Sequence, residues 1–104
     1  MLRTAGNRIA WLGQSTVQIT TSNGKIILID PWVKENPSFP ASMKNFPRID
    51  LILATHGHCD HTGDVVPLAL AYNAPVVAIF ELALWFGSKG VVNILPMGKG
   101  GTQH

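Results

Sequence analysis

The sequence predicts an α/β domain, and two features of the chain carry this prediction. Between Ile49 and Leu95, short apolar stretches alternate with helix-like stretches in the order β-α-β-α-β. A β-hairpin pattern precedes them in the chain. Such an alternation builds a largely parallel sheet with crossover helices. The 104 residues are enough for one small domain and too few for two, so we treat residues 1–104 as a single domain.

The hairpin is predicted from two strand-like stretches and the turn between them. Residues Ile9 to Thr20 show a broken alternation rich in β-branched and aromatic side chains, and Ile26 to Ile29 is a short apolar run. The connection between them contains Asn23-Gly24. This dipeptide is the one that a type I′ turn prefers, because both central residues need a positive φ. We therefore expect a type I′ hairpin here.

The remaining elements follow from composition and periodicity. Residues 31–47 hold four of the seven prolines, with Asn, Ser and Lys among them, which indicates a surface loop. We then expect, in chain order, a strand at 49–54, a helix at 64–72, a strand at 75–80, a helix at 81–88 and a strand at 91–95. Ligands of open α/β sheets gather beyond the carboxyl ends of strands, so a site is expected directly after Ala54.

Composition argues against several classes of partner and location. Eight Lys and Arg against six Asp and Glu give a net charge of +2 without a basic run, so neither nucleic acid nor membrane is an expected partner. No apolar run is long enough to cross a bilayer, and the first residues lead into a strand pattern rather than a signal segment. The single cysteine, Cys59, excludes an intrachain disulfide and fits a reducing compartment, so we expect a cytoplasmic protein.

Three of the four histidines lie within six residues, in a run that ends Asp60-His61. Residues two apart on extended backbone point the same way, so His56 and His58 can converge on one ion. If the chain then turns into a helix, Asp60 and His61 could hold a second ion nearby, as two-metal hydrolases require. These ligand types suit zinc, manganese or iron. The alternative is a set of surface histidines near a helix start, with Asp60 capping that helix and no metal bound.

Several side chains outside this run have open roles. Asp30 follows a predicted strand and could accept the second N–H of a ligating imidazole, or it could cap a turn before the next proline. Asp64 is better explained as a first-turn helix residue than as a ligand. The three tryptophans, Trp11, Trp32 and Trp85, could line a pocket, although core packing is the usual explanation in a small domain.

With these pieces placed, the chain resembles the metallo-β-lactamase superfamily, and within it the metal-dependent hydrolases related to ascorbate-6-phosphate lactonases. The matching segments, in the family's order, are Trp11–Ser15, Ile27–Trp32, Asp50–His61 with Gly63-Asp64, and Met97 with Gly100–Thr102. The resemblance implies that His56 and His58 bind a first metal and that Asp60 and His61 bind a second. It also implies that Asp30 orients the site without itself binding a metal.

The resemblance further implies that the chain is the N-terminal half of a metallo-β-lactamase-like αββα sandwich, so residues 1–104 would be a partial domain. The expected activity is hydrolysis by water activated by one or two divalent ions, zinc or manganese, with Asp60 orienting the nucleophile. A lactone or a phosphorylated small molecule is the substrate class that kinship suggests. The chain departs from the family at Gln14, where a histidine is usual, and no counterpart of the family's later ligands follows; His104 is interpreted as an exposed tail residue.

Two explanations of the short chain stay open. A missing C-terminal half would complete a hydrolase. Alternatively, the chain is a truncated, non-catalytic metal-binding half-domain, or one that pairs with a second copy of itself.

Overall fold

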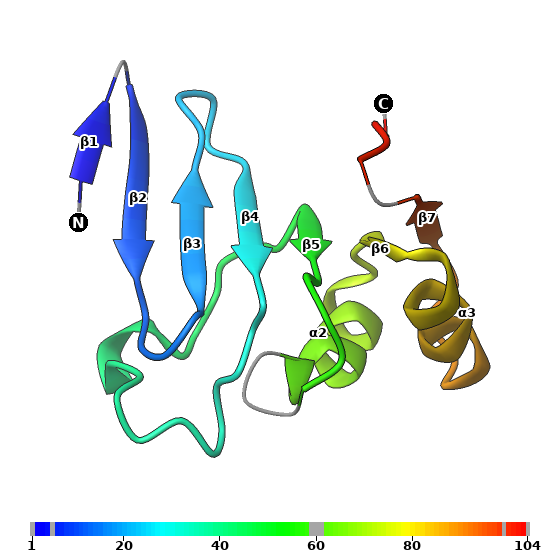
Figure 1. The fold of residues 1–104 in the computed structure, drawn as a ribbon. Coiled ribbons are helices and arrows are strands. Elements are labelled where there is room, and N and C mark those ends of the chain that lie inside the picture. Colours follow the sequence, from blue (N-terminus) through cyan, green and yellow to red (C-terminus); the bar gives the residue numbers. More distant parts are fainter. Residues whose placement is uncertain (1, 5, 59–61, 99, 104) are drawn as a thin grey trace.

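The computed structural model describes residues 2–4, 6–58, 62–98 and 100–103 (Figure 1). Its strands are β1 (Leu2–Thr4), β2 (Asn7–Trp11), β3 (Val17–Thr20), β4 (Ile26–Ile29), β5 (Leu51–Leu53), β6 (Val76–Ile79) and β7 (Ile94–Met97). Its helices are α2 (Val65–Tyr72) and α3 (Phe80–Ser88), with a short 3-10 helix at Ala41–Met43.

The strands form one seven-stranded sheet whose spatial order follows the chain, from β1 to β7. Strands β1 to β4 pair antiparallel, whereas β4, β5, β6 and β7 pair parallel. Helices α2 and α3 connect the parallel strands and lie at that end of the sheet (Figure 1). The predicted α/β class and the β-α-β-α-β order are therefore confirmed.

The antiparallel half contains a turn that the sequence interpretation missed. Residues 9–20 are not one strand, because β2 ends at Trp11 and β3 begins at Val17. Between them, the Leu12 N–H donates to the Thr16 carbonyl at 2.8 Å, and Gly13 and Gln14 have φ angles of 102° and 53°. The broken alternation of this stretch reflects the turn.

The hairpin of β3 and β4 is confirmed, but its predicted turn type is wrong. The Thr21 N–H donates to the Lys25 carbonyl, and the Gly24 N–H donates to the Thr21 carbonyl at 2.9 Å. Only Gly24 in this turn has a positive φ, of 86°, whereas a type I′ turn requires two such residues. A longer loop with a single left-handed glycine connects the strands instead.

One face of the sheet is covered, and the segment after β4 contributes to the cover. The strands bury Ile26, Leu28, Ile52, Val76 and Ala78 in a cluster with Val65, Ala69, Ala83 and Phe86 of the helices. Residues 31–47 lack regular structure apart from the 3-10 helix, as expected, yet Val33, Phe39 and Phe46 are buried in the same cluster. The segment is therefore part of the core, not only a surface loop.

Apart from Asn7 at the start of β2, the opposite face of the sheet is apolar over β2 to β7, and it has no covering element among the described residues. The strand register places on it Ile9, Trp11, Val17, Ile19, Ile27, Ile29, Leu51, Leu53, Val77, Ile79, Leu95 and Met97. We call this set the open face. Its side chains are partly exposed, up to 68% for Trp11. The expectation that core packing explains the tryptophans is thus wrong for Trp11, and also for Trp85, which is 51% exposed on α3.

Within the part of the chain that the structure describes, neither helix has the length and apolar character that crossing a bilayer requires.

Candidate metal centre at the carboxyl edge of the sheet

His56 and His58 follow the end of β5, at the edge where several strands end. Strands β2 and β4 run in the same direction, because each pairs antiparallel with β3, and β5 pairs parallel with β4. The turn after β2 and the end of β4 accordingly lie at one edge of the sheet (Figure 1). Ligand sites of α/β sheets are found beyond the carboxyl ends of strands, which is the edge occupied here.

Thr16 joins two of these strand ends and was missed by sequence reasoning. Its buried hydroxyl donates to the Asp30 carbonyl at 2.7 Å and accepts the Trp32 N–H at 3.1 Å. The hydroxyl thereby fixes the backbone on both sides of Pro31. The role of Thr16 becomes visible only when the structure brings it next to Asp30, because no local sequence pattern indicates it.

Asp30 is buried, with 3% of its surface exposed, and its side chain reaches the end of the neighbouring strand. One carboxylate oxygen accepts the Thr55 N–H at 2.7 Å, and the other accepts the Thr55 hydroxyl at 2.5 Å. The residue adopts a left-handed φ of 48°, while its own N–H donates to the Leu53 carbonyl at 2.9 Å. Asp30 therefore holds the residue that immediately precedes the first histidine of the motif.

The two histidines that the structure describes lie side by side. The rings of His56 and His58 have centroids 4.7 Å apart and planes inclined at 86°. Nδ1 of His56 lies 2.9 Å from the Thr55 hydroxyl oxygen. His56 is half-buried and His58 is exposed, so both imidazoles are within reach of an ion from solvent. Adjacent imidazoles are a donor set that fits zinc or a related transition metal.

The other two predicted ligands, Asp60 and His61, lie outside the described residues, as does Cys59. Thr62 follows them, and both its N–H and its hydroxyl donate to the His58 carbonyl at 3.0 Å. The N–H bond has the i to i+4 spacing of an α-helix. Among the residues on either side of this gap, no group of three or more His, Cys, Asp or Glu side chains comes together. His104 also lies outside the described residues.

Asp64 has a role that its sequence position did not indicate. It occupies the position before the first residue of α2, but its side chain makes no capping bond to that helix. Instead, one carboxylate oxygen accepts the N–H groups of Val33 and Lys34 at 2.5 and 3.1 Å. The Asp64 N–H in turn donates to the Pro31 carbonyl at 3.1 Å. Asp64 thus ties the start of α2 to the segment that leaves β4.

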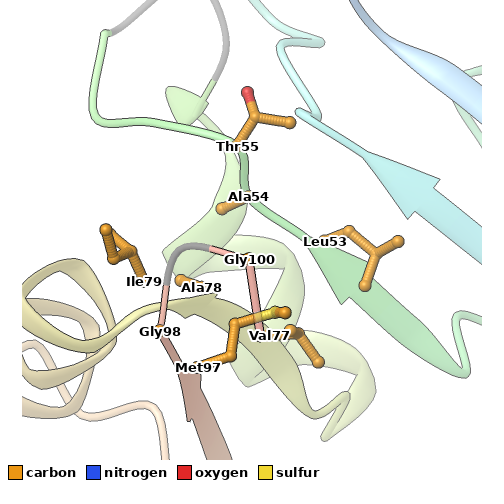
Figure 2. A pocket seen from close by; sticks show the side chains of 9 residues that line it. All are labelled: Leu53, Ala54, Thr55, Val77, Ala78, Ile79, Met97, Gly98 and Gly100. Atoms are coloured by element: carbon orange, nitrogen blue, oxygen red, sulfur yellow. The ribbon is translucent and has the colours of Figure 1, made fainter. Parts of the chain in front are cut away.

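A hollow of about 470 Å³ lies beside the motif, on the open face. Figure 2 shows its lining around the ends of β5, β6 and β7: Leu53, Ala54, Thr55, Val77, Ala78, Ile79, Met97, Gly98 and Gly100. Among the described residues of this lining, Thr55 contributes the only polar side chain. An apolar group next to the histidines would therefore meet apolar walls.

Comparison with known proteins identifies relatives of this arrangement. The model of a β-lactamase superfamily domain matches residues 8–78. A "UPF0173 metal-dependent hydrolase" of Koribacter versatilis is 48% identical over 99 residues, which are 95% of this chain and 42% of that protein. A protein of the same description from Rubrobacter xylanophilus is 45% identical and is covered to 41%. The chain thus spans about two fifths of the length of the curated relatives it matches.

Solved structures show the same fold. Igni18, described as a novel metallo hydrolase from Ignicoccus hospitalis, superposes with a TM-score of 0.72 at 28% identity, over 89% of this chain and 40% of that one. CmlA, a diiron β-hydroxylase from Streptomyces venezuelae, gives a TM-score of 0.71 at 18% identity, over 93% of this chain and 22% of its own, which shows the fold alone. The expected family is confirmed: the chain belongs to the β-lactamase superfamily.

Proposed function

We propose that this chain carries the metal-binding part of a metal-dependent hydrolase. The observation that carries the proposal is the pair of adjacent imidazoles, His56 and His58, at the carboxyl edge of the sheet, with Asp30 bonded to the residue before them. The name of the matched relatives, metal-dependent hydrolase, supports the same chemistry.

In this proposal His56 and His58 hold a first divalent ion, and Asp60 and His61 hold a second. Zinc and manganese are the ions that best suit imidazole and carboxylate donors together. Such ions, when present, lower the pKa of water toward about 7 and polarise the oxygen under attack. Asp60 would orient the attacking water by a hydrogen bond, while Asp30 and Thr55 hold the first histidine in place.

We further propose a lactone or a phosphorylated small molecule as the substrate. The described lining of the hollow beside Thr55 favours the lactone, because its other side chains are apolar and suit an apolar ring; Lys99, between the lining residues Gly98 and Gly100, lies outside the described residues. An apolar ring substituent would fit those walls, with the ester carbonyl directed toward the histidines.

The alternative function is non-catalytic: a half-domain that binds metal for its stability or pairs with a second copy. The open face favours this alternative, because a sheet face on which apolar side chains predominate needs a covering layer. In the hydrolase proposal, further polypeptide supplies that layer. In the alternative, a second copy of the chain supplies it.

Native mass spectrometry of protein purified without chelators tests both. A species that carries one or two transition-metal ions, and that hydrolyses a member of a lactone panel, supports the hydrolase. The substitution His58→Ala should then abolish hydrolysis and reduce bound metal while the far-UV circular dichroism stays unchanged. Lys25→Ala is the matched control, because Lys25 is exposed in the β3–β4 turn at the opposite edge of the sheet.

Different results support the alternative. A dimer without hydrolytic activity indicates a pairing half-domain. Loss of both metal and fold in His58→Ala indicates a structural metal. A metal-free wild-type protein would contradict both metal-binding readings.

A further inference from the structure

One hydroxyl group lies between a buried carboxylate and the first histidine of the motif. The Thr55 Oγ1 is 2.5 Å from a carboxylate oxygen of Asp30 and 2.9 Å from Nδ1 of His56. A hydroxyl has a single proton to donate but can also accept. The direction of the two hydrogen bonds therefore depends on which neighbour takes that proton.

The carboxylate decides the direction. An ionised carboxylate can only accept, so the Thr55 hydroxyl must direct its proton to Asp30. The hydroxyl oxygen is then left as an acceptor for His56, and Nδ1 must carry the ring proton. In the neutral imidazole, the lone pair consequently lies on Nε2.

We propose that Thr55 is a positioning residue that fixes His56 in its Nδ1–H tautomer and so makes Nε2 the metal-binding atom. The inference rests on the proposed metal site and adds to it the atom that binds and the residue that selects it. Ring nitrogens of metal-binding histidines are commonly fixed by such a bond on the other nitrogen, made directly to a carboxylate, carbonyl or water. Here a threonine hydroxyl connects the imidazole to the carboxylate.

Several hydrogen bonds fix this connection. Asp30 accepts two from Thr55, one from its N–H and one from its hydroxyl. The backbone of Asp30 is itself fixed by the Leu53 carbonyl and by the Thr16 hydroxyl. Because Asp30 and Thr55 are each held by several hydrogen bonds, the tautomer is set before an ion arrives, which reduces the cost of ordering the ligand on binding.

The substitution Asp30→Asn gives the sharpest test. The Thr55 N–H still requires an acceptor, so the amide oxygen must face it and the amide NH₂ must face the Thr55 hydroxyl. The NH₂ then donates to the hydroxyl, which in turn donates its own proton to Nδ1 of His56. The tautomer is expected to invert to Nε2–H, with the lone pair moved away from the metal side.

The substitution Thr55→Val removes the hydroxyl and keeps the β-branched shape, whereas Thr55→Ser keeps the hydroxyl. Thr62→Val is the matched control, because the Thr62 hydroxyl bonds the His58 carbonyl and not an imidazole. The full-length protein, freed of metal and held near pH 8, is labelled with ¹⁵N on histidine, and long-range ¹H–¹⁵N correlations report the tautomer. Zinc affinity is measured separately by competition with a chromophoric chelator.

We expect Nδ1–H at His56 in the wild type, in Thr55→Ser and in Thr62→Val, inversion in Asp30→Asn, and loss of the single tautomer in Thr55→Val. Zinc affinity should fall about 10- to 100-fold in Asp30→Asn and Thr55→Val and recover in Thr55→Ser. An Nδ1–H tautomer that persists in both Asp30→Asn and Thr55→Val would overturn the proposal. Wild-type protein with the expected tautomer but no zinc binding would instead overturn the proposed metal site.

Discussion

Replacing Asp64 by alanine should destabilise the fold by about 4 kcal/mol, although Asp64 is not an expected metal ligand. Its carboxylate accepts the N–H groups of Val33 and Lys34, the first bond buried and the second partly buried. Hydrogen bonds to a charged group contribute about 1.5–3 kcal/mol each. The buried N–H, left without an acceptor, accounts for the larger share of the loss.

Asp64→Asn should cost about half as much, because one carboxylate oxygen accepts both bonds and the amide oxygen of asparagine can take its place as a weaker, neutral acceptor. Urea unfolding followed by tryptophan fluorescence measures each change in the free energy of unfolding. Glu35→Ala is the control, since Glu35 is an exposed acid in the same segment and should change stability by less than about 0.5 kcal/mol. If Asp64→Ala costs no more than Glu35→Ala, the tie between α2 and the segment after β4 contributes nothing, and the reasoning fails.

Three further predictions concern the backbone, pH and metal. Gly13→Ala should destabilise by at least about 1 kcal/mol more than Gly24→Ala in the same urea assay. Both glycines have a positive φ, but an added Cβ at Gly13 would lie 2.8 Å from the Ser38 Cβ, whereas nothing lies within 4 Å at Gly24. A hydrogen bond from the Arg48 side chain and a weaker effect of the Ile26 N–H lower the pKa of Asp50 from its ordinary 3.8. The unfolded chain therefore binds the proton more readily. The contribution of Asp50 to the free energy of unfolding is present above pH 3.8 and is lost as the pH falls through the lower pKa of the folded state. Asp50→Asn should therefore flatten the acid limb of a stability–pH curve. Zinc at 100 times its Kd should raise the free energy of unfolding by about 2.7 kcal/mol over chelated protein, and an unchanged urea midpoint would argue against a site in the native state.

Local pattern was sufficient for the regular elements because their signals are local. The apolar run of β4 and the alternation of strands with helices after residue 49 predicted the order of elements in the parallel half correctly, although the last strand, expected at 91–95, runs from Ile94 to Met97. The turn after β2 was missed because one of its supports comes from outside the turn. The Trp11 indole N–H donates to the Gln14 carbonyl at 2.7 Å, in a turn where Gln14 adopts a positive φ without being glycine.

The burial of Val33, Phe39 and Phe46 within residues 31–47 could not be predicted from composition, which correctly indicated an irregular segment. Phe39 and Phe46 pack edge to face with centroids 6.3 Å apart, and Phe46 packs in the same way against Tyr72 of α2. The Tyr72 hydroxyl also donates to the Phe46 carbonyl at 2.9 Å. Tyr72 lies 26 residues after Phe46, so the proline and asparagine content of the segment indicates its irregular backbone but not where its aromatic rings pack.

The candidate site was likewise predicted only in part: the pair of histidines was expected, and the threonines beside it were not. The spacing of His56 and His58 predicted that two imidazoles would lie together, and the rings are adjacent. The threonines that connect this site, Thr16 and Thr55, escaped notice because their bonds to Asp30 span 14 and 25 residues. A hydroxyl is too common in sequence to signal a role until the strand ends that it joins are known.

Asp30 and Asp64 make bonds on either side of the histidine run, whose residues 59–61 lie outside the described part of the chain. Asp30 bonds Thr55, directly before His56, and Asp64 directly precedes α2. The two carboxylates are themselves joined by a short stretch of backbone, since Asp64 accepts N–H groups only three and four residues after Asp30. Thr55 and Asp64 are therefore both hydrogen-bonded to the short stretch of residues 30–34. A metal site gains precision from such supporting bonds on rigid elements. Substituting Asp64 should therefore weaken metal binding although Asp64 is not a proposed ligand, because the start of α2 would shift relative to Thr55. An equally destabilising substitution far from this edge should leave the metal affinity of the folded protein unaltered.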